Sequence, residues 1–389
     1  MKPLFTLISI LFLINGYSQT YCLMVDQNNG SQEYLGTYDI STGLMNQIST
    51  SPTSSFANNG TSPVIDPINR KYIYSNGNPG PVKIIDLDNG SVVDSFYYPP
   101  GVFPRHFAYN ELDSTMYCLM TDMTNGWKEA FGTFDISSGT MTQISTSTIS
   151  SFVNNGTTPV IDPINRKYVY ASNTNTVKII DLDNGSMVDS FYFSNGIYPR
   201  HFAYNQLDLT MYCLIVDQNN GAQEYLGTFN TSSGLMSQIS ITPTSNASTN
   251  NGTNPTIDPI NRKYIYSTKN PGPVIIIDLD NGTVVDSFSY NNGFFPRHFA
   301  YIDNGLTGIS NVNDELTFKV YPNPTSHQIS IFSGELTINE IKILDSTGKL
   351  IKTIKQSTNT INVSDLSQGI YFVQILSDKK TITKKFVIQ

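Results

Sequence analysis

Residues 82–97, VKIIDLDNGSVVDSFY, decide the fold, because two runs rich in β-branched residues flank an Asp-Asn-Gly turn. Strand-forming runs on either side of Asn-Gly are the strongest short-range signal for a β-hairpin. Nearly the same stretch returns at residues 177–192 and at residues 274–289. The chain therefore builds one hairpin three times, which predicts a repeat fold.

The repeat has a period of 96 residues, set by three Asp-Pro pairs that begin at Asp66, Asp162 and Asp258. Each copy contains a weaker duplication, since residues 34–43 form a second strand-turn unit of the same kind. The structural unit is therefore half a period, the length typical of a propeller blade. Four short strands are expected in one unit, at residues 103–109, 116–121, 131–135 and 140–144.

Six such units span residues 21–301. Because no single unit can bury both faces of its sheet, we predict an all-β, six-bladed β-propeller over residues 19–301. The repeat region starts with a second strand at residues 21–25 and ends with a lone first strand at residues 295–301. Pairing of these two strands would complete one blade and remove an open sheet edge.

Composition excludes several classes of protein. Charged residues make up 14% of the 389 residues, below the usual quarter, and this balance favours strands and turns over long helices. The net charge of −8 and the absence of a Lys/Arg cluster argue against a nucleic-acid partner.

The N-terminus has the pattern of a signal peptide, residues 1–18. Lys2 precedes a short apolar run at residues 4–14, and small residues precede the expected cut after Ser18. The run is shorter than the roughly 20 apolar residues of a membrane span, and no later stretch is long enough. We expect an exported protein without a membrane span.

Three cysteines recur at equivalent places in the repeats: Cys22, Cys118 and Cys213. Copies arranged around an axis lie too far apart for disulfides, so we expect buried small side chains. A reactive thiol is the alternative.

The segments YIYS, VKIIDLDNGSVVDSF and FPRHFAYNELDSTMYC resemble the YVTN-type propeller repeat of surface-layer and related secreted proteins. The resemblance spans residues 21–301. It implies a fold and leaves the activity open.

After residue 301 the period ends in a linker, residues 302–315, rich in Asn, Asp, Gly and Ser. Residues 316–389 contain about seven short strand patterns with evenly spaced turns, which is typical of a small Ig-like antiparallel sandwich. Four motifs in this segment resemble, in the same order, those of the type A sorting domain of the type IX secretion system. Their residues are Tyr321, Pro322, Asn323, Pro324, Gly348, Gly369, Tyr371, Lys384 and Lys385.

This resemblance implies the type IX secretion machinery as a partner and a Gram-negative host. It places the protein at the outer cell surface or in the medium. An ordinary Ig-like binding domain is the alternative.

Three Arg-His pairs begin the first strands of alternate blades. We expect them on the long-loop face, the face that carries the loops at residues 49–61, 145–157 and 241–253, with those at 27–33 and 123–129 beside them. In one interpretation, the three imidazoles converge on a metal or an anion at the channel mouth, which requires them to lie close together. In the other, each pair bonds within its own blade to an Asp that ends the second strand. The residues are Arg105, His106, Arg200, His201, Arg297 and His298, with Asp26, Asp122 and Asp217 as the expected acids.

Two further features have competing interpretations. Trp127, the only tryptophan, could contact a sugar or a partner from its loop, or pack within that loop. Residues 86–90, DLDNG, superficially resemble a calcium loop but supply too few oxygen ligands, so hairpin geometry is favoured. No metal and no cofactor are predicted.

No nucleophile–base order, paired acidic motif, phosphate loop or zinc spacing is present, so no catalytic residue is assigned. Near-identical copies also disfavour an enzyme, because catalysis needs groups with different roles. We expect a secreted or surface-displayed propeller that binds a glycan or a protein. The alternatives are a propeller hydrolase or lyase with an Arg/His site at the channel mouth, and a structural surface-layer component.

Overall fold

The computed structural model divides the chain into two compact units, Met1–Leu306 and Thr307–Gln389. The expected signal peptide and nearly all of the expected linker lie outside the described residues. The structure describes residues 19–55, 63–75, 80–151, 159–173, 175–246, 254–268, 271–290, 293–302, 319–321, 323, 325–332, 338–345, 349–354, 360–377 and 381–388.

The described residues of the first unit form six antiparallel sheets, here called A to F in chain order. Three of them, A, C and E, carry a short fifth strand beside the third. Sheet A consists of β27 (Phe294–Ile302), β1 (Gln19–Asp26), β2 (Gln32–Tyr38) and β3 (Met45–Gln47), with β4 (Ser54–Ser55). Sheet C consists of β9 (Val102–Asn110), β10 (Thr115–Asp122), β11 (Lys128–Phe134) and β12 (Met141–Gln143), with β13 (Ser150–Ser151). Sheet E consists of β18 (Ile197–Asn205), β19 (Thr210–Asp217), β20 (Gln223–Phe229) and β21 (Met236–Gln238), with β22 (Ser245–Asn246).

The sheets between them have four strands each. Sheet B consists of β5 (Val64–Asp66), β6 (Lys71–Ser75), β7 (Val82–Asp86) and β8 (Val92–Phe96). Sheet D consists of β14 (Val160–Asp162), β15 (Lys167–Asn173), β16 (Thr176–Asp181) and β17 (Met187–Tyr192). Sheet F consists of β23 (Thr256–Asp258), β24 (Lys263–Ser267), β25 (Val274–Asp278) and β26 (Val284–Phe288). The described residues contain no α-helix, and their only helical segments are the 3-10 turns η1 (Gln27–Asn29) and η2 (Gln218–Asn220).

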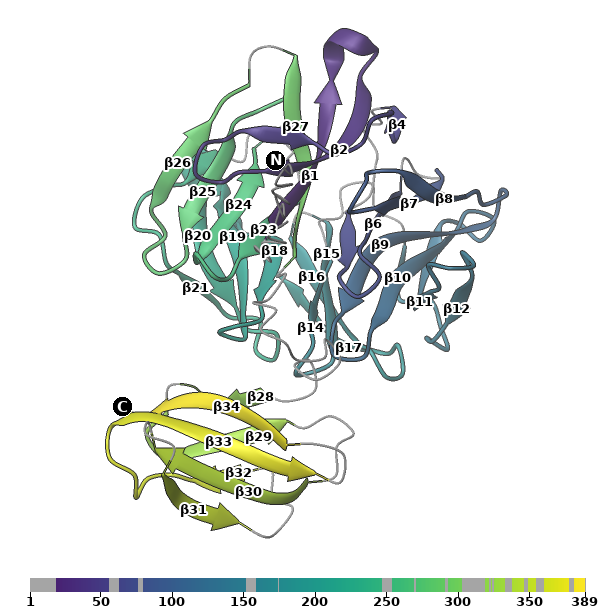
Figure 1. The fold of residues 1–389 in the computed structure, drawn as a ribbon. Helices are drawn as coiled ribbons and strands as arrows, with labels where there is room; N and C mark the ends of the chain where they lie inside the picture. Colours follow the sequence, from purple (N-terminus) through teal and green to yellow (C-terminus); the bar gives the residue numbers. More distant parts are fainter. Residues whose placement is uncertain are drawn as a thin grey trace, which may run out of the picture. The chain divides into compact units, whose positions relative to one another are not determined.

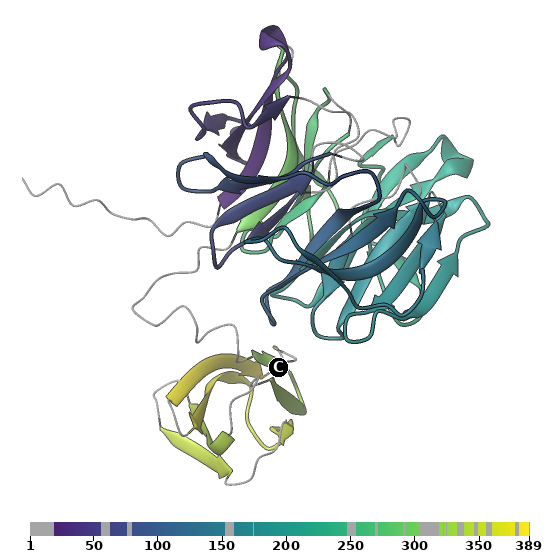
Figure 2. The same ribbon diagram turned by 90° about the vertical axis from the view of Figure 1, so that its right-hand side faces the viewer.

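The first strands of the sheets contact one another in a closed series: β27, β5, β9, β14, β18, β23 and again β27. The two ends of the repeat region meet within sheet A, where β1 pairs antiparallel with β27 and Tyr21 lies opposite Ala300. Figures 1 and 2 both show β27, in green, beside β1, in purple. The expected pairing of residues 295–301 with residues 21–25 is therefore present.

Two kinds of interface alternate between successive sheets. Within a 96-residue repeat, tyrosines of the second sheet pack on leucines of the first, as Tyr72 and Tyr74 do on Leu23 and Leu35. Between repeats the contact is made of Phe, Met, Cys and β-branched residues, as around Cys118. The same two compositions recur around the unit. Burial of these apolar side chains is the main force that holds the sheets together.

The DLDNG segment is a hairpin turn, as its sequence predicts. Gly90 has φ 69° and donates its N–H to the Asp86 carbonyl at 2.9 Å. One carboxylate oxygen of Asp86 accepts the Asp88 N–H at 3.0 Å, and the other accepts Lys71 Nζ at 2.6 Å. This carboxylate is thus occupied by the turn and by a cation of the chain itself.

The second unit has two antiparallel sheets. One consists of β28 (Lys319–Tyr321), β29 (Gln328–Phe332) and β32 (Thr360–Asn362). The other consists of β31 (Leu350–Ile354), β30 (Ile338–Asp345), β33 (Gly369–Ser377) and β34 (Thr381–Ile388). Their apolar residues, among them Ile329, Ile343 and Phe386, form one buried core. The described residues of this unit thus form seven strands in two sheets.

Replacement of Gly185 by Ala is expected to destabilise the first unit through a direct clash. Gly185 has φ +66°, and a Cβ there would lie 2.6 Å from the Ser145 backbone nitrogen in the neighbouring sheet. Gly221 has φ +67° but open space around it, so Gly221→Ala isolates the backbone cost of about 1–2 kcal/mol. The free energy of unfolding in urea should fall clearly further in Gly185→Ala than in Gly221→Ala. Equal losses would contradict this packing.

Candidate functional site

A β-bulge holds each of the three Arg-His pairs. In sheet C, Arg105 lies opposite Leu119 and Ala108 lies opposite Tyr117, so His106 and Phe107 together face only Cys118. Two residues against one is the definition of a bulge. His106 accordingly has φ 54°, in the left-handed region that is unusual for a side chain other than glycine. The same geometry recurs at His201 and His298.

The bulge turns the histidine carbonyl toward the next sheet. There it accepts a hydrogen bond from a fully buried tyrosine hydroxyl, as Tyr72 of β6 donates to the His298 carbonyl at 2.6 Å. Tyr168 donates in the same way to His106, and Tyr264 to His201. Each Arg-His sheet is therefore joined to the sheet that follows it by a hydrogen bond in a buried interface.

The arginine of each pair is buried in the same interface. The side chain of Arg105 is 2% exposed, and its Nη1 lies 3.7 Å from Oε1 of Glu129, which is itself 4% exposed. Arg297 Nη1 lies 3.4 Å from Glu33 Oε1, and Arg200 Nε lies 3.7 Å from Glu224 Oε1. In two copies a tyrosine of the next sheet also reaches the glutamate, at 3.3 Å for Tyr74 and 3.4 Å for Tyr266. The glutamates are thus paired with both a cation and a hydroxyl donor.

The acids beside the arginines differ from those expected, and strand geometry explains the correction. Leu119, opposite Arg105, shares a face of the sheet with it, and Asp122 is three residues further along, so it faces the other side. Glu129 is two residues from Phe131, which pairs with Leu119, and so lies on the same face as Arg105.

The carboxylates of Asp26, Asp122 and Asp217 instead accept N–H groups of the turns that follow them. In Asp122 the hydrogen bonds from Thr124 lower the carboxyl pKa.

In each of the three pairs the histidine accepts a hydrogen bond from the neighbouring arginine, which a ring nitrogen can do only without a proton. Arg105 Nη2 donates to His106 Nε2, and Arg200 Nη2 to His201 Nε2 at 2.5 Å, which leaves the ring proton on Nδ1. Burial, and then the charge of the adjacent arginine, hold the pKa of His106 well below its ordinary value. The pKa values of His201 and His298 are lowered for the same reasons. Among the described residues, no group of three or more His, Cys, Asp or Glu side chains is placed to hold a metal ion. The Arg-His pairs lie at the contacts between sheets, where a tyrosine of the next sheet reaches each histidine carbonyl.

The cysteines opposite the bulges are free and fully buried. Burial raises the pKa of Cys22, Cys118 and Cys213 above the ordinary thiol value. A protonated, inaccessible thiol is a small apolar side chain in this setting.

Trp127 packs against the end of its own sheet. Its ring meets that of Phe103 edge to face, with centroids 6.3 Å apart. The residue has φ 60° and is half-buried. Trp127 therefore contacts an aromatic side chain of its own sheet, and its role in contacting a sugar or a partner stays a prediction.

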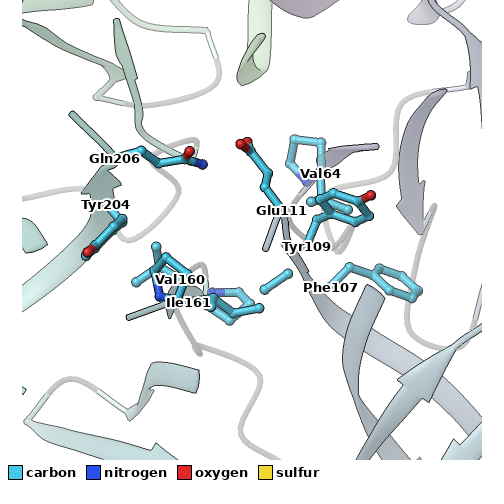
Figure 3. A pocket seen from close by; sticks show the side chains of 12 residues that line it. Val64, Phe107, Tyr109, Glu111, Val160, Ile161, Tyr204 and Gln206 are labelled. Carbon is cyan, nitrogen blue, oxygen red and sulfur yellow. The ribbon is translucent and has the colours of Figure 1, made fainter. Parts of the chain in front are cut away.

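A cavity of about 170 Å³, which the sequence analysis did not anticipate, lies among the first strands of sheets B to E. Figure 3 shows Glu111 and Gln206 extending toward one another from opposite sides, above Val160 and Ile161. Glu111 and Gln206 follow β9 and β18 directly, in the short turns. The available signal is a break in the repetition, since this position changes from Glu to Gln between otherwise similar copies.

In the second unit, the described part of the sorting motif contacts the last strand. Asn323 accepts the Val387 N–H at 2.8 Å and donates to the Lys385 carbonyl at 3.3 Å. Tyr371 stacks on Phe386 at a centroid distance of 5.8 Å and donates its hydroxyl to the Ser367 carbonyl at 2.9 Å. Asn323 and Tyr371 belong to motifs far apart in the sequence, and both contact the last strand, β34. Pro322, Pro324 and Gly348 lie outside the described residues, while Tyr321 ends β28, Gly369 begins β33, and Lys384 and Lys385 belong to β34.

Residues 319–389 match the secretion system C-terminal sorting domain. The match confirms the sorting segment inferred from the motifs. It indicates export through the type IX secretion system, to the cell surface or the medium. In the described part of the chain, no helix has the length and apolar character needed to cross a membrane.

The chain is similar in fold to two solved structures with propeller-like architecture. The first is described as the crystal structure of a nidogen/laminin complex, with a TM-score of 0.51 and 11% identity over 73% of this chain and 99% of that one. The second is a protein of unknown function from Bacteroides caccae, with a TM-score of 0.50 and 12% identity over 74% of this chain and 99% of that one. Such identities indicate fold alone. No curated protein matches the sequence.

Replacement of Glu129 by Gln is expected to cost about 3–5 kcal/mol of unfolding free energy, because it leaves the buried Arg105 charge without its carboxylate. Asp122→Asn is the matched control, since it removes the same charge from an acid that accepts turn N–H groups. Urea unfolding of both variants measures the difference. A larger loss of unfolding free energy in Asp122→Asn would contradict this assignment and would indicate that Asp122 is the partner of Arg105.

The three buried histidines predict a loss of stability in mild acid. Their pKa values are lowered on folding, so the unfolded chain takes up more protons once the pH falls below about 6.5. Each can contribute up to about 1.4 kcal/mol per pH unit below that value. A variant with Asn at positions 106, 201 and 298, a residue that tolerates positive φ, should lose this dependence between pH 6.5 and 5. Unchanged slopes of unfolding free energy against pH would contradict the neutral state of the histidines.

Proposed function

We propose that residues 19–301 form a six-bladed β-propeller of the YVTN type, exported from a Gram-negative cell to bind a glycan or a protein. The residues after 315 form an Ig-like sorting domain in this proposal. Six sheets whose first strands contact in a closed series support the blade number. The pairing of β1 with β27 supports closure by the two ends of the repeat region.

Binding is favoured over catalysis by one observation: the most reactive polar groups of the repeats are used between sheets. The exposed fractions of Arg105 and His106 are 1% and 5%, and each group is bonded to neighbours in the interface. The three copies are alike, whereas an acid–base pair needs two different environments. A hydrolase or lyase with an Arg/His site at the channel mouth is therefore the weaker candidate.

A rigid ring with an export signal suits recognition outside the cell. Its loops are held at fixed positions by a scaffold of packed sheets, which is the common arrangement for binding proteins. A propeller-like chain occurs in the nidogen/laminin structure, so scaffolds of this type take part in protein complexes. A structural surface-layer role is the other candidate, and ordered self-assembly of the purified chain would favour it.

Binding should be detected when the mature chain, residues 19–389, is applied to arrays of glycans and extracellular proteins. If the ligand lies on the long-loop face, Trp127→Ala should weaken binding about five- to tenfold through loss of an aromatic contact. Ile260→Ala, which removes a 55% exposed apolar side chain from the short turn after β23 on the opposite face, is the control and should bind normally. Absence of binding together with regular arrays of the protein alone would replace this proposal with a structural role.

A further inference from the structure

The last strands of sheets B, D and F form exposed edges of the first unit. Each of β8, β17 and β26 stands at the end of its strand order and pairs, within the described residues, with one strand only. Figure 1 shows β8 and β26 at the periphery of the first unit. Such an edge presents unpaired N–H and C=O groups, which can pair with an edge strand of another chain.

These three edges also expose apolar side chains. Each strand begins with two apolar residues whose exposed fractions lie between 37% and 55%: Val92, Val93, Met187, Val188, Val284 and Val285. A strand edge that combines unpaired backbone groups with exposed apolar side chains is a typical site of association between chains. Since all three edges have nearly the same sequence, the partner that each one fits best is the same edge of a second copy.

One outward-pointing N–H of each edge is bonded within the chain. In β17, Oδ1 of Asp189 accepts the N–H of Ser190 at 2.7 Å. The ladder shows that this N–H points away from the sheet. Phe193 donates its N–H inward, to the Asn175 carbonyl at 2.8 Å, and N–H groups alternate in direction along an antiparallel strand. Ser190 is three residues from Phe193 and therefore donates outward.

The same bond recurs in the other two edges. Asp94 accepts the Ser95 N–H at 2.7 Å, and Asp286 accepts the Ser287 N–H at 2.8 Å. In all three strands a β-bulge lies directly before the aspartate. Charged side chains and bulges are the means by which natural sheets prevent pairing at an exposed edge.

The edges of sheets A, C and E offer an internal comparison. There the strand order ends with β3, β12 and β21, which have three residues each, MNQ, MTQ and MSQ, and no charge. A strand of this length has few backbone groups to offer to another chain. Among these six edge strands, an acid is therefore present only in the three that are long enough to pair.

The acid also lies at the middle of the edge. Asp94 is the third of five residues in β8, and Asp286 is the third of five in β26. When two identical strands pair antiparallel over their full length, the middle residue lies opposite its own copy, at a Cα distance of about 4.5–5.5 Å. Like charges directly opposite one another destabilise a strand pair. The carboxylate thus opposes association both by holding the outward N–H and by its charge.

We propose that Asp94, Asp189 and Asp286 keep the exported chain monomeric by preventing its long edge strands from pairing with those of a second copy. The interaction surface is the outward side of β8, β17 and β26, and the partner is the same surface of another chain. This proposal does not depend on which ligand the long-loop face recognises.

Sedimentation velocity of the mature chain, residues 19–389, tests this surface. The parent chain should be monomeric at about 100 μM. Asp189→Thr, which removes both the acceptor and the charge from one edge, should form dimers with a Kd below about 100 μM, because two identical edges make a closed pair. The combination of Asp94→Thr, Asp189→Thr and Asp286→Thr should form larger assemblies, since each copy then has three edges able to pair.

Two further variants separate edge pairing from a general effect of charge or folding. The combination of Asp26→Thr, Asp122→Thr and Asp217→Thr removes three charges from acids that accept turn N–H groups, and it should stay monomeric. Addition of Val188→Lys to Asp189→Thr should restore the monomer, because it returns a charge to the edge. A misfolded chain would not regain its monomeric state in this way.

The proposal is overturned if the parent chain itself associates at this concentration, or if the edge variant with three substitutions stays monomeric. Equal association of the variant with three turn substitutions would overturn it as well. Should the edge variant with three substitutions lose its cooperative thermal unfolding, Asp189→Thr decides, because a folded monomer there removes the role of the acid. Ligand binding is measured on the parent chain, so failure of the binding role is distinguishable from failure of this proposal.

Discussion

The first unit depends on a hydrogen bond between a buried tyrosine hydroxyl and the carbonyl of a histidine held at positive φ. A bulged carbonyl in a dry interface would lose its water without replacement, which costs about 1–3 kcal/mol. The tyrosine of the following sheet removes that cost, and it can do so only when the two sheets are in the correct relative position. The hydrogen bond therefore fixes the position of one sheet relative to the next and also stabilises the contact between them. The buried Arg–Glu pair beside it acts in the same sense, because a charge pair in the interior tolerates little displacement.

The same interaction explains how the ends of the repeat region are held. In sheet A, Arg297 and His298 come from β27 at the end of the repeats, while Glu33 comes from β2 near their beginning. Tyr72 of sheet B then donates to the His298 carbonyl. The polar set of sheet A is thus complete only when the two ends have paired. In sheets C and E the corresponding groups follow one another within a single stretch of chain.

Much of this architecture was predictable from the sequence, because a strand followed by an Asn-Gly or Asp-Gly turn is a local signal that recurs at a fixed period. The strands of sheet C lie within one residue of their expected bounds, except that β11 begins three residues earlier than expected. The partner of Arg105 was not predictable in this way, since an added bulge residue changes which side chains share a face. The aspartates that end the second strands were expected as partners because they lie near the arginines along the sheet. The partners are instead the glutamates of the third strands, whose side chains lie on the same face of the sheet as the arginines. The cavity escaped prediction for a different reason. Its walls come from four sheets, and Glu111 and Gln206 resemble ordinary turn residues when each repeat is considered alone.

The alternation of interfaces has a consequence for how such a ring can change in size. A sheet with a bulged Arg-His strand needs a tyrosine-bearing sheet after it, and the tyrosine-bearing sheet presents an apolar face to the next repeat. Gain or loss of one sheet would place two sheets of the same kind side by side and leave an arginine or a carbonyl buried without its partner. Gain or loss of a whole 96-residue copy preserves every interface. A change in length that preserves every interface therefore adds or removes two sheets at a time, which keeps the number of sheets even.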